Sequence, residues 1–236
     1  MTICIAAISN SGKYCCYAVD TMITAQFPIG YEFETKDVRK IYPLNENVYV
    51  LTAGDALGAS TIIKKLISKH KLEEKQTVKE ITELLLEEYQ NYRRELIQQI
   101  HFFPRGLNIA TYYEIQQKLQ IGLVNILDNQ LANFDLNVSL IILGYDKDGQ
   151  KSCHLYSINN PGVLICHDEI GFACIGSGAP HATYYLIGEK YKKTMDKAEV
   201  KKLVLEAKKK SEVAPGVGQD TTFDFLPTVK NGVDNK

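Results

Sequence analysis

The sequence lacks the features of several common protein classes. No run approaches the roughly 18 apolar residues that a membrane-spanning helix needs, and the N-terminal stretch MTICIAAISNSGK has no basic segment before its short apolar run. The 27 Lys and Arg residues nearly balance the 28 Asp and Glu residues, which argues against a general affinity for nucleic acids or anionic membranes. We therefore expect a cytoplasmic protein that binds neither a membrane nor nucleic acid.

Motifs for metal binding and redox chemistry are also absent. The five histidines show no HExxH spacing, and the six cysteines form no CxxC pair. The sequence thus predicts no metal site and requires no cofactor. Apolar or strand-like surroundings favour reduced core thiols over disulfides or metal ligands at Cys4, Cys15, Cys16, Cys153, Cys166 and Cys174.

The length and composition that are present fit one folded domain. The chain has 236 residues, 45% of them hydrophobic, and no internal repeat, which is enough for a single large core. The last residues, KNGVDNK, are polar and carry no strand or helix pattern. We expect one domain over residues 1–226 and a flexible polar tail over residues 227–236.

The first quarter of the chain predicts two β-hairpins. Residues 3–9 (ICIAAIS) and 14–21 (YCCYAVDT) are rich in strand formers and are separated by a Ser-Gly turn. Residues 37–44 (DVRKIYPL) and 47–54 (NVYVLTAG) flank a second short turn. The stretch between the two hairpins, to about Thr35, is rich in Gly, Pro and aromatic residues and is expected to be a loop.

Helix patterns follow the second hairpin. Residues 55–70 place their apolar side chains close to helical spacing. A Thr-x-x-Glu capping box at Thr77 predicts the start of the next helix, which continues to about Leu96 and should pack against a sheet. A similar box at Thr111 predicts a further helix to about Phe134.

Strand patterns return in the second half. Residues 137–146 (NVSLIILGYD) and 151–158 (KSCHLYSI) surround an Asp-Gly turn at Asp148, and residues 163–178 (VLICHDEIGFACIGSG) contain further strand-like runs. Two helices are then expected, the first beginning near Pro180 and the second at a capping box that starts at Asp196, before a last strand, TTFDFLPT.

The order of elements indicates the fold class. Strands, a helix pair, strands, a second helix pair and a final strand do not alternate as βαβ units do, so the sheets should be antiparallel. Because the strands are hydrophobic at nearly every position, both faces of each sheet should be covered. We expect an α+β protein with two sheets inside and helices outside.

Several segments together resemble the proteasome β-subunit family and its bacterial ring-forming relatives, such as the ClpQ-type heat-shock peptidase and Anbu. TICIAAIS is similar to the strand that opens with a nucleophilic Thr, and YAVDTMIT to the next strand, which ends in Asp-Ser/Thr. DVRKIYPLNENVYVLTAGDALG is the closest match, with the family's Lys-to-Gly separation kept from Lys40 to Gly54. SLIILGYDKDGQKSCHLYSINNPG and ACIGSGAPHATYYL resemble a later hairpin and a Gly-Ser-Gly turn into a helix. The resemblance implies a four-layer αββα sandwich, the N-terminal-nucleophile (Ntn) hydrolase fold.

The same resemblance implies a set of catalytic roles. Thr2 is expected to be the nucleophile once Met1 has been removed, with its freed α-amine as general base, since an α-amine titrates near neutrality and the backbone holds it close to the hydroxyl. Lys40 is expected beside Thr2 as a buried cation, paired with Asp20. The backbone N–H of Gly54 would bind the oxyanion.

The resemblance also implies supporting and substrate-binding residues. Ser177 is expected to hydrogen-bond near the amine and to relay its proton, and Thr24 to hold the substrate backbone. The first specificity pocket should accept apolar side chains of moderate size, and by the same mapping it is lined by Ile23, Val38, Tyr42, Thr52 and Ala56.

The sequence departs from the family pattern at two places. The family has an Asp-x-x-Ser-Gly element before its last strands, whereas SEVAPGVGQDTT offers Glu212 and glycines but no matching serine. Met22 stands where the family has Arg, and residues 25–37 include an insertion, so the wall that binds substrate should be altered.

The overall expectation is a threonine-type endopeptidase that cleaves peptides or unfolded proteins inside a homo-oligomeric ring. Two alternatives remain: another Ntn amide hydrolase or peptide ligase that uses Thr2, and a non-catalytic proteasome-like scaffold subunit that retains Met1. Residues from about 93 to 133 exceed the family's second helix, which favours an extra helical hairpin on the outer layer over a cap at a ring interface or chamber entrance. Whether an ATPase unfoldase acts as partner is left open by the sequence.

Overall fold

The computed structural model describes residues 2–25, 31–34, 39–147 and 152–227. Within these residues a four-stranded antiparallel sheet has the order β10-β1-β2-β11. The N-terminal strand therefore lies inside the sheet, between two neighbours. The strands of this sheet are β1 (Cys4–Ser9), β2 (Tyr14–Asp20), β10 (Phe172–Ile175) and β11 (Thr221–Leu226).

A second antiparallel sheet has five strands in the order β5-β6-β7-β8-β9. Each strand pairs with the next strand along the chain: β5–β6, β7–β8 and β8–β9 are hairpins, whereas residues 55–137 separate β6 from β7. Its strands are β5 (Ile41–Pro43), β6 (Val48–Gly54), β7 (Val138–Tyr145), β8 (Cys153–Asn159) and β9 (Val163–Cys166), and a separate two-stranded hairpin is formed by β3 (Met22–Ala25) and β4 (Tyr31–Glu34).

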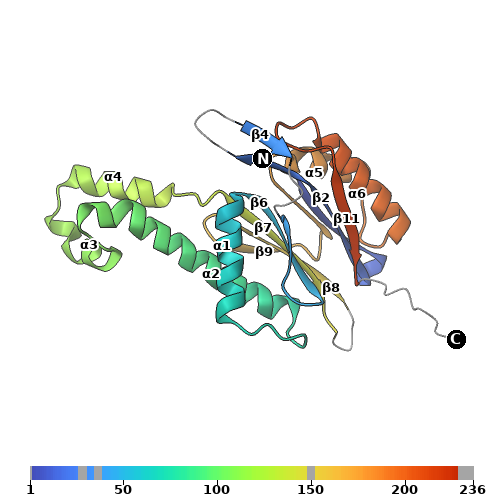
Figure 1. Cartoon of the computed structure of the whole chain (residues 1–236), viewed down its shortest axis with the longest axis horizontal. Helices are drawn as coiled ribbons and strands as arrows, with labels where there is room; N and C mark the ends of the chain where they lie inside the picture. The colour runs from blue at the N-terminus through green and yellow to red at the C-terminus, as the bar shows by residue number, and fades with distance from the viewer. Residues whose placement is uncertain (1, 26–30, 35–38, 148–151, 228–236) are drawn as a thin grey trace.

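Helices cover the outer face of each sheet (Figure 1). Helices α1 (Ala56–Lys69) and α2 (Val78–Ile97) pack on the five-stranded sheet, and α5 (Ala179–Gly188) and α6 (Lys197–Ser211) pack on the four-stranded sheet. The architecture is therefore the α+β, four-layer αββα sandwich of the Ntn-hydrolase type that the sequence predicts.

Three apolar layers hold the four structural layers together. One joins α1 and α2 to the five-stranded sheet, one lies between the sheets, and one joins α5 and α6 to the four-stranded sheet. All six residues of β1 are buried, which explains why this strand is hydrophobic at almost every position. Large central side chains of the layer between the sheets are Ile8, Leu51, Ile141, Leu143 and Leu155.

Most predicted element boundaries are confirmed. Reciprocal capping boxes are present at Thr77 and at Asp196, and the side chain of Asp55 caps α1. The hairpins β1–β2 and β5–β6 form as expected, although β5 begins only at Ile41. The predicted turn at Asp148 lies outside the described residues, as do the residues after 227.

Two expectations are wrong. The stretch expected as a loop after β2 contains the hairpin β3–β4. The helix expected from Thr111 to Phe134 starts earlier and is divided. The Asn108 side chain accepts a hydrogen bond from the Thr111 N–H, so the helix start lies three residues before the expected one. The chain then becomes extended at Leu119 and Gln120, which separates α3 (Ile109–Ile115) from α4 (Ile121–Ala132).

The elements after α2 extend away from the sandwich (Figure 1). A short π-helical turn, η2 (Gln98–Phe102), continues α2 and leads through a Pro-containing turn toward α3. These elements have a small core of their own, formed by Ile97, Phe102, Tyr112 and Leu127.

Candidate active site

Strand pairing brings the N-terminus and two distant segments together. Cys4 pairs with Val19 on one side and with Ile175 on the other. Asp20, at the end of β2, and the Gly-Ser-Gly turn that follows β10 therefore both lie beside Thr2, which precedes β1 and is only 2% exposed. The β-register is thus what assembles the site.

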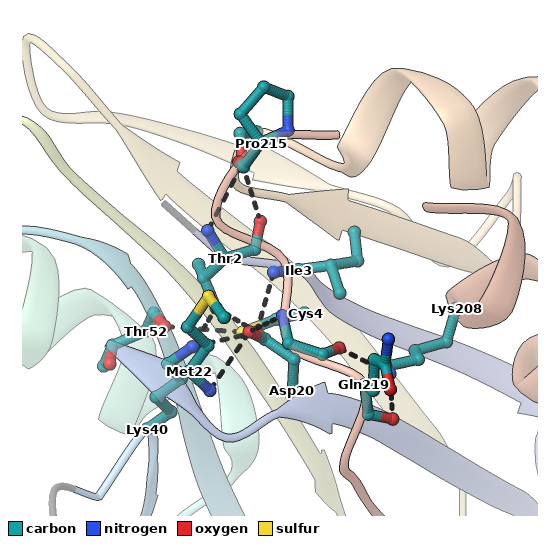
Figure 2. A network of polar contacts seen from close by, with 12 residues as sticks. Thr2, Ile3, Cys4, Asp20, Met22, Lys40, Thr52, Lys208, Pro215 and Gln219 are labelled. Carbon is teal, nitrogen blue, oxygen red and sulfur yellow. Dashed lines mark hydrogen bonds and ion pairs between the residues drawn. The ribbon is translucent and has the colours of Figure 1, made fainter. Parts of the chain in front are cut away.

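The Asp20 carboxylate is completely buried and is surrounded by donors (Figure 2). Its Oδ1 accepts hydrogen bonds from the backbone N–H of Ile3 at 2.9 Å and from the Lys40 ammonium at 2.8 Å. Its Oδ2 accepts from the backbone N–H of Gly218 at 3.0 Å and of Met22 at 3.3 Å. A buried charge needs such partners, and these fix the orientation of the carboxylate.

Lys40 reaches Thr2 from the other sheet. Its backbone C=O accepts from the Thr52 N–H at 2.9 Å, which continues the β5–β6 ladder and fixes the lysine backbone. Its Nζ donates to both Thr2 Oγ1 and Asp20 Oδ1, and its side chain is 9% exposed. Thr2 Oγ1 in turn donates to Asp20 Oδ1. The hydroxyl therefore lies between a cation and an anion.

The direct Thr2–Asp20 contact goes beyond the sequence expectation, which gave Asp20 only the task of pairing with Lys40. The structure places one carboxylate oxygen against both the hydroxyl and the ammonium. A hydroxyl that accepts from a cation and donates to an anion has its proton and its lone pairs oriented.

The Gly-Ser-Gly turn holds the backbone of Thr2. Thr2 N, a peptide nitrogen as long as Met1 is attached, donates to Ser177 Oγ at 3.3 Å. Thr2 O accepts from the N–H of Gly178 at 3.2 Å. Gly176 has φ +98°, and a Cβ there would lie 2.2 Å from Thr2 O, so this position requires glycine.

Gly54 is the glycine that follows Lys40 in the segment resembling the family. It ends β6 with φ +90°, and a Cβ would lie 1.9 Å from Asn137 O, so both its backbone conformation and its close packing require glycine. Gly54 is exposed. Its task as oxyanion donor stays a prediction.

The predicted substrate-binding residues that the structure describes come from four elements. Thr52 is buried in β6, and Ala56 is the first residue of α1. Tyr42, in β5, packs against the apolar layer beneath α1 and α2, so its ring contributes to that core. Ile23 and Thr24 belong to β3, and Val38 lies outside the described residues.

The thiol closest to the site in sequence, Cys4, is inert. Burial raises its pKa far above the ordinary value, although the nearby Lys40 cation opposes this, and its Sγ contacts Thr52 O at 3.4 Å. It stays protonated at neutral pH and does not compete with Thr2 as nucleophile. All six cysteines are free, and Cys166 differs from the expected core position because it is exposed on β9.

Sequence reasoning missed the support that the loop after α6 gives to Asp20. The sequence offers Glu212 as the acidic residue of this stretch but identifies no supporting pair, and in the structure the Glu212 side chain pairs with Lys208 at 2.7 Å. The group that reaches Asp20 is the backbone N–H of Gly218. The available signal was Lys208 itself, which occurs on the apolar face of α6 one turn after Val204.

The described residues hold no group of three or more His, Cys, Asp or Glu side chains arranged to bind a metal. A search of the same residues finds no helix long and apolar enough to cross a membrane.

Comparison with known proteins gives a match to a family model. Residues 123–212 match the family model of the proteasome subunit, a span that runs from α4 through β7–β10 to the end of α6. No curated protein matches the sequence. The match and the two-sheet architecture together support a proteasome-like, Ntn-hydrolase fold for this chain.

Proposed function

We propose that this protein is an N-terminal threonine peptidase of the proteasome β type, in which Thr2 becomes the nucleophile after Met1 is removed. The observation that carries the proposal is the contact of Thr2 Oγ1 with both the Lys40 ammonium and the Asp20 carboxylate. A buried ion pair usually adds little to stability, because the cost of removing both charges from water is about as large as their attraction. Stabilising a strand end therefore does not explain an ion pair around the hydroxyl of the second residue.

The chemistry proceeds in two halves. Once Met1 is removed, the Thr2 hydroxyl turns its proton from Asp20 to the freed α-amine, which takes it as Oγ1 attacks the peptide carbonyl carbon. The Lys40 ammonium stabilises the negative charge that develops on Oγ1. The Gly54 N–H donates to the oxyanion. The α-ammonium then protonates the leaving amine, the C–N bond breaks, and an ester on Thr2 remains. Water, deprotonated by the same amine, hydrolyses this ester and frees the hydroxyl.

The other residues at the site position these groups. Ser177 Oγ lies 3.3 Å from Thr2 N, where it can accept from the freed amine and pass on its proton. Asp20 balances the charge of Lys40 and fixes the direction of the Thr2 hydroxyl. The chain, the peptide substrate and water provide every atom that reacts, so the reaction itself requires no cofactor.

The substrate class that fits is a peptide or an unfolded protein with apolar side chains, held by Thr24 and the pocket residues named above. Self-association into a ring encloses a nucleophile of this kind and protects folded proteins, as in the ring-forming relatives of the ClpQ and Anbu type. In this arrangement the elements after α2, which extend away from the sandwich and have a core of their own, are the extra helical hairpin, and the protein acts in the cytoplasm.

Two measurements test the proposal. Intact mass of the purified protein must show the loss of Met1, and an electrophilic threonine-directed inhibitor must add to Thr2 with the loss of peptide cleavage. Thr2→Ala should abolish both labelling and cleavage, whereas Thr194→Ala, at an exposed turn residue, should change neither. Cleavage that persists in Thr2→Ala contradicts the proposal.

The same measurements separate the alternatives. A protein that keeps Met1 and forms rings without labelling is a scaffold subunit. A labelled protein that transfers the acyl group to an added amine faster than to water is a ligase or an acylase, because the fold does not fix the acceptor.

A further inference from the structure

Lys208 is a buried cation outside the group that contacts Thr2. It lies on the inner face of α6 and is 1% exposed. Its Nζ donates to Glu212 Oε1 at 2.7 Å, to Gly218 O at 2.7 Å and to Gln219 O at 2.6 Å. An ammonium has three N–H donors, so all three are satisfied, and two of them bind consecutive carbonyls of one loop.

The same loop carries the donor to the site. The N–H of Gly218 binds Asp20 Oδ2 at 3.0 Å, and its C=O is held by Lys208. The peptide planes before and after the Gly218 Cα are thus fixed by Asp20 and by Lys208 respectively. Glycine has a wide range of backbone conformations, so this N–H depends on neighbouring contacts for its direction.

We propose that Lys208 is a positioning residue that fixes the Gly218 N–H and, through it, the Asp20 carboxylate that contacts Thr2 and Lys40. Figure 2 shows the arrangement, with Lys208 and Gln219 on one side of Asp20 and Lys40 on the other. The proposal rests on the proposed function of Thr2. It also accounts for the missing Ser in the supporting element: here a lysine of α6 and a glycine N–H of the following loop support the site.

If Lys208 only stabilised the fold, its loss would lower the free energy of unfolding and leave the kcat of the folded protein unchanged. A positioning role predicts an effect on kcat. Lys208 contacts neither the hydroxyl nor any residue of the expected pocket, so its loss should leave substrate binding intact. A carboxylate that loses one fixed donor can rotate, which changes the direction of the Thr2 hydroxyl that donates to it. The effect should therefore appear in kcat and not in KM.

The test compares Lys208→Met with Lys209→Met, an exposed lysine on the same helix. We expect Lys208→Met to lower kcat for a fluorogenic peptide by about 10- to 100-fold, the size of one lost hydrogen bond to a charged group, with KM changed less than about twofold. Lys209→Met should match the wild type. If Lys208→Met does not fold, Lys208→Gln, which keeps two N–H donors without the charge, should show a smaller loss in the same direction.

Amide hydrogen exchange of Gly218 provides a readout that does not depend on activity. Exchange at this N–H should become faster in the Lys208 variants and stay unchanged in Lys209→Met. Unlabelled, inactive wild-type protein contradicts the proposed function, and the exchange rates then still decide the link between Lys208 and Gly218. An active wild type with unchanged kcat and unchanged Gly218 exchange in the Lys208 variants overturns the inference.

Discussion

Replacing Lys40 by methionine removes the ammonium that contacts Thr2 Oγ1 and keeps most of the apolar stem. The variant leaves the nucleophile, its backbone contacts and the Gly-Ser-Gly turn in place. Because Nζ also pairs with Asp20 at 2.8 Å, the change acts on both the reaction and the stability of the fold. The effect on the reaction is measured as a change in kcat, and the effect on the fold as a change in the free energy of unfolding.

The structure sets the size of each effect. Loss of one preorganised donor to a developing oxygen anion costs about 10²- to 10³-fold in kcat. Removal of one partner from a buried ion pair costs about 3–5 kcal/mol in the free energy of unfolding. Asp20 keeps three backbone donors, from Ile3, Met22 and Gly218, so the stability loss should be near the lower limit, about 3 kcal/mol.

The assay measures kcat on a fluorogenic peptide well below the unfolding temperature, with urea unfolding measured separately. Lys71→Met, at an exposed residue after α1, is the matched control and should leave both quantities unchanged. A Lys40→Met protein that remains folded and keeps kcat within about threefold of the wild type would refute the proposed part of the ammonium in the reaction.

Three further perturbations have defined outcomes. Asp20→Asn removes the negative charge beside Lys40 and should lower kcat by at least about 100-fold with little change in KM, as peptide kinetics would show. Gly176→Ala should destabilise the protein by more than about 1 kcal/mol in urea unfolding and lower activity, since the added Cβ meets Thr2 O, whereas Gly122→Ala, in open space on α4, should not destabilise it. Burial lowers the pKa of His167 below its ordinary 6.5, although Asp168 opposes this. The unfolded chain therefore binds the proton first as pH falls below 6.5, and the free energy of unfolding declines until the pKa of the folded state is passed. His167→Gln should flatten that decline below pH 6.5, as urea unfolding at a series of pH values would show.

Local rules were sufficient for much of the fold. Capping boxes and hairpin turns depend on residues that are close in sequence. The capping boxes at Thr77 and Asp196 identified two helix starts, and the alternation of hairpins with helix pairs gave the order of the elements. The start of helix α3 was placed at Thr111 instead of Asn108 because either residue forms a good N-cap.

The sequence predicted the side chains of the candidate site but not the backbone groups that support them. Thr2, Asp20, Lys40 and Ser177 were found through the resemblance and lie together in the structure. The donor from Gly218 is a backbone group in a loop, and its direction depends on tertiary contacts with Asp20 that no local pattern contains.

The site is divided between the two sheets, and this has a consequence for its precision. Thr2, Asp20 and Ser177 extend from the strands of one sheet, while Lys40 leads into β5 of the other. The reach of the lysine is therefore set by the spacing of the sheets, about 10 Å in such packings, and by their relative slide. The apolar side chains between the sheets act as a spacer, so a cavity made there, far from any reacting atom, changes the distance from ammonium to hydroxyl.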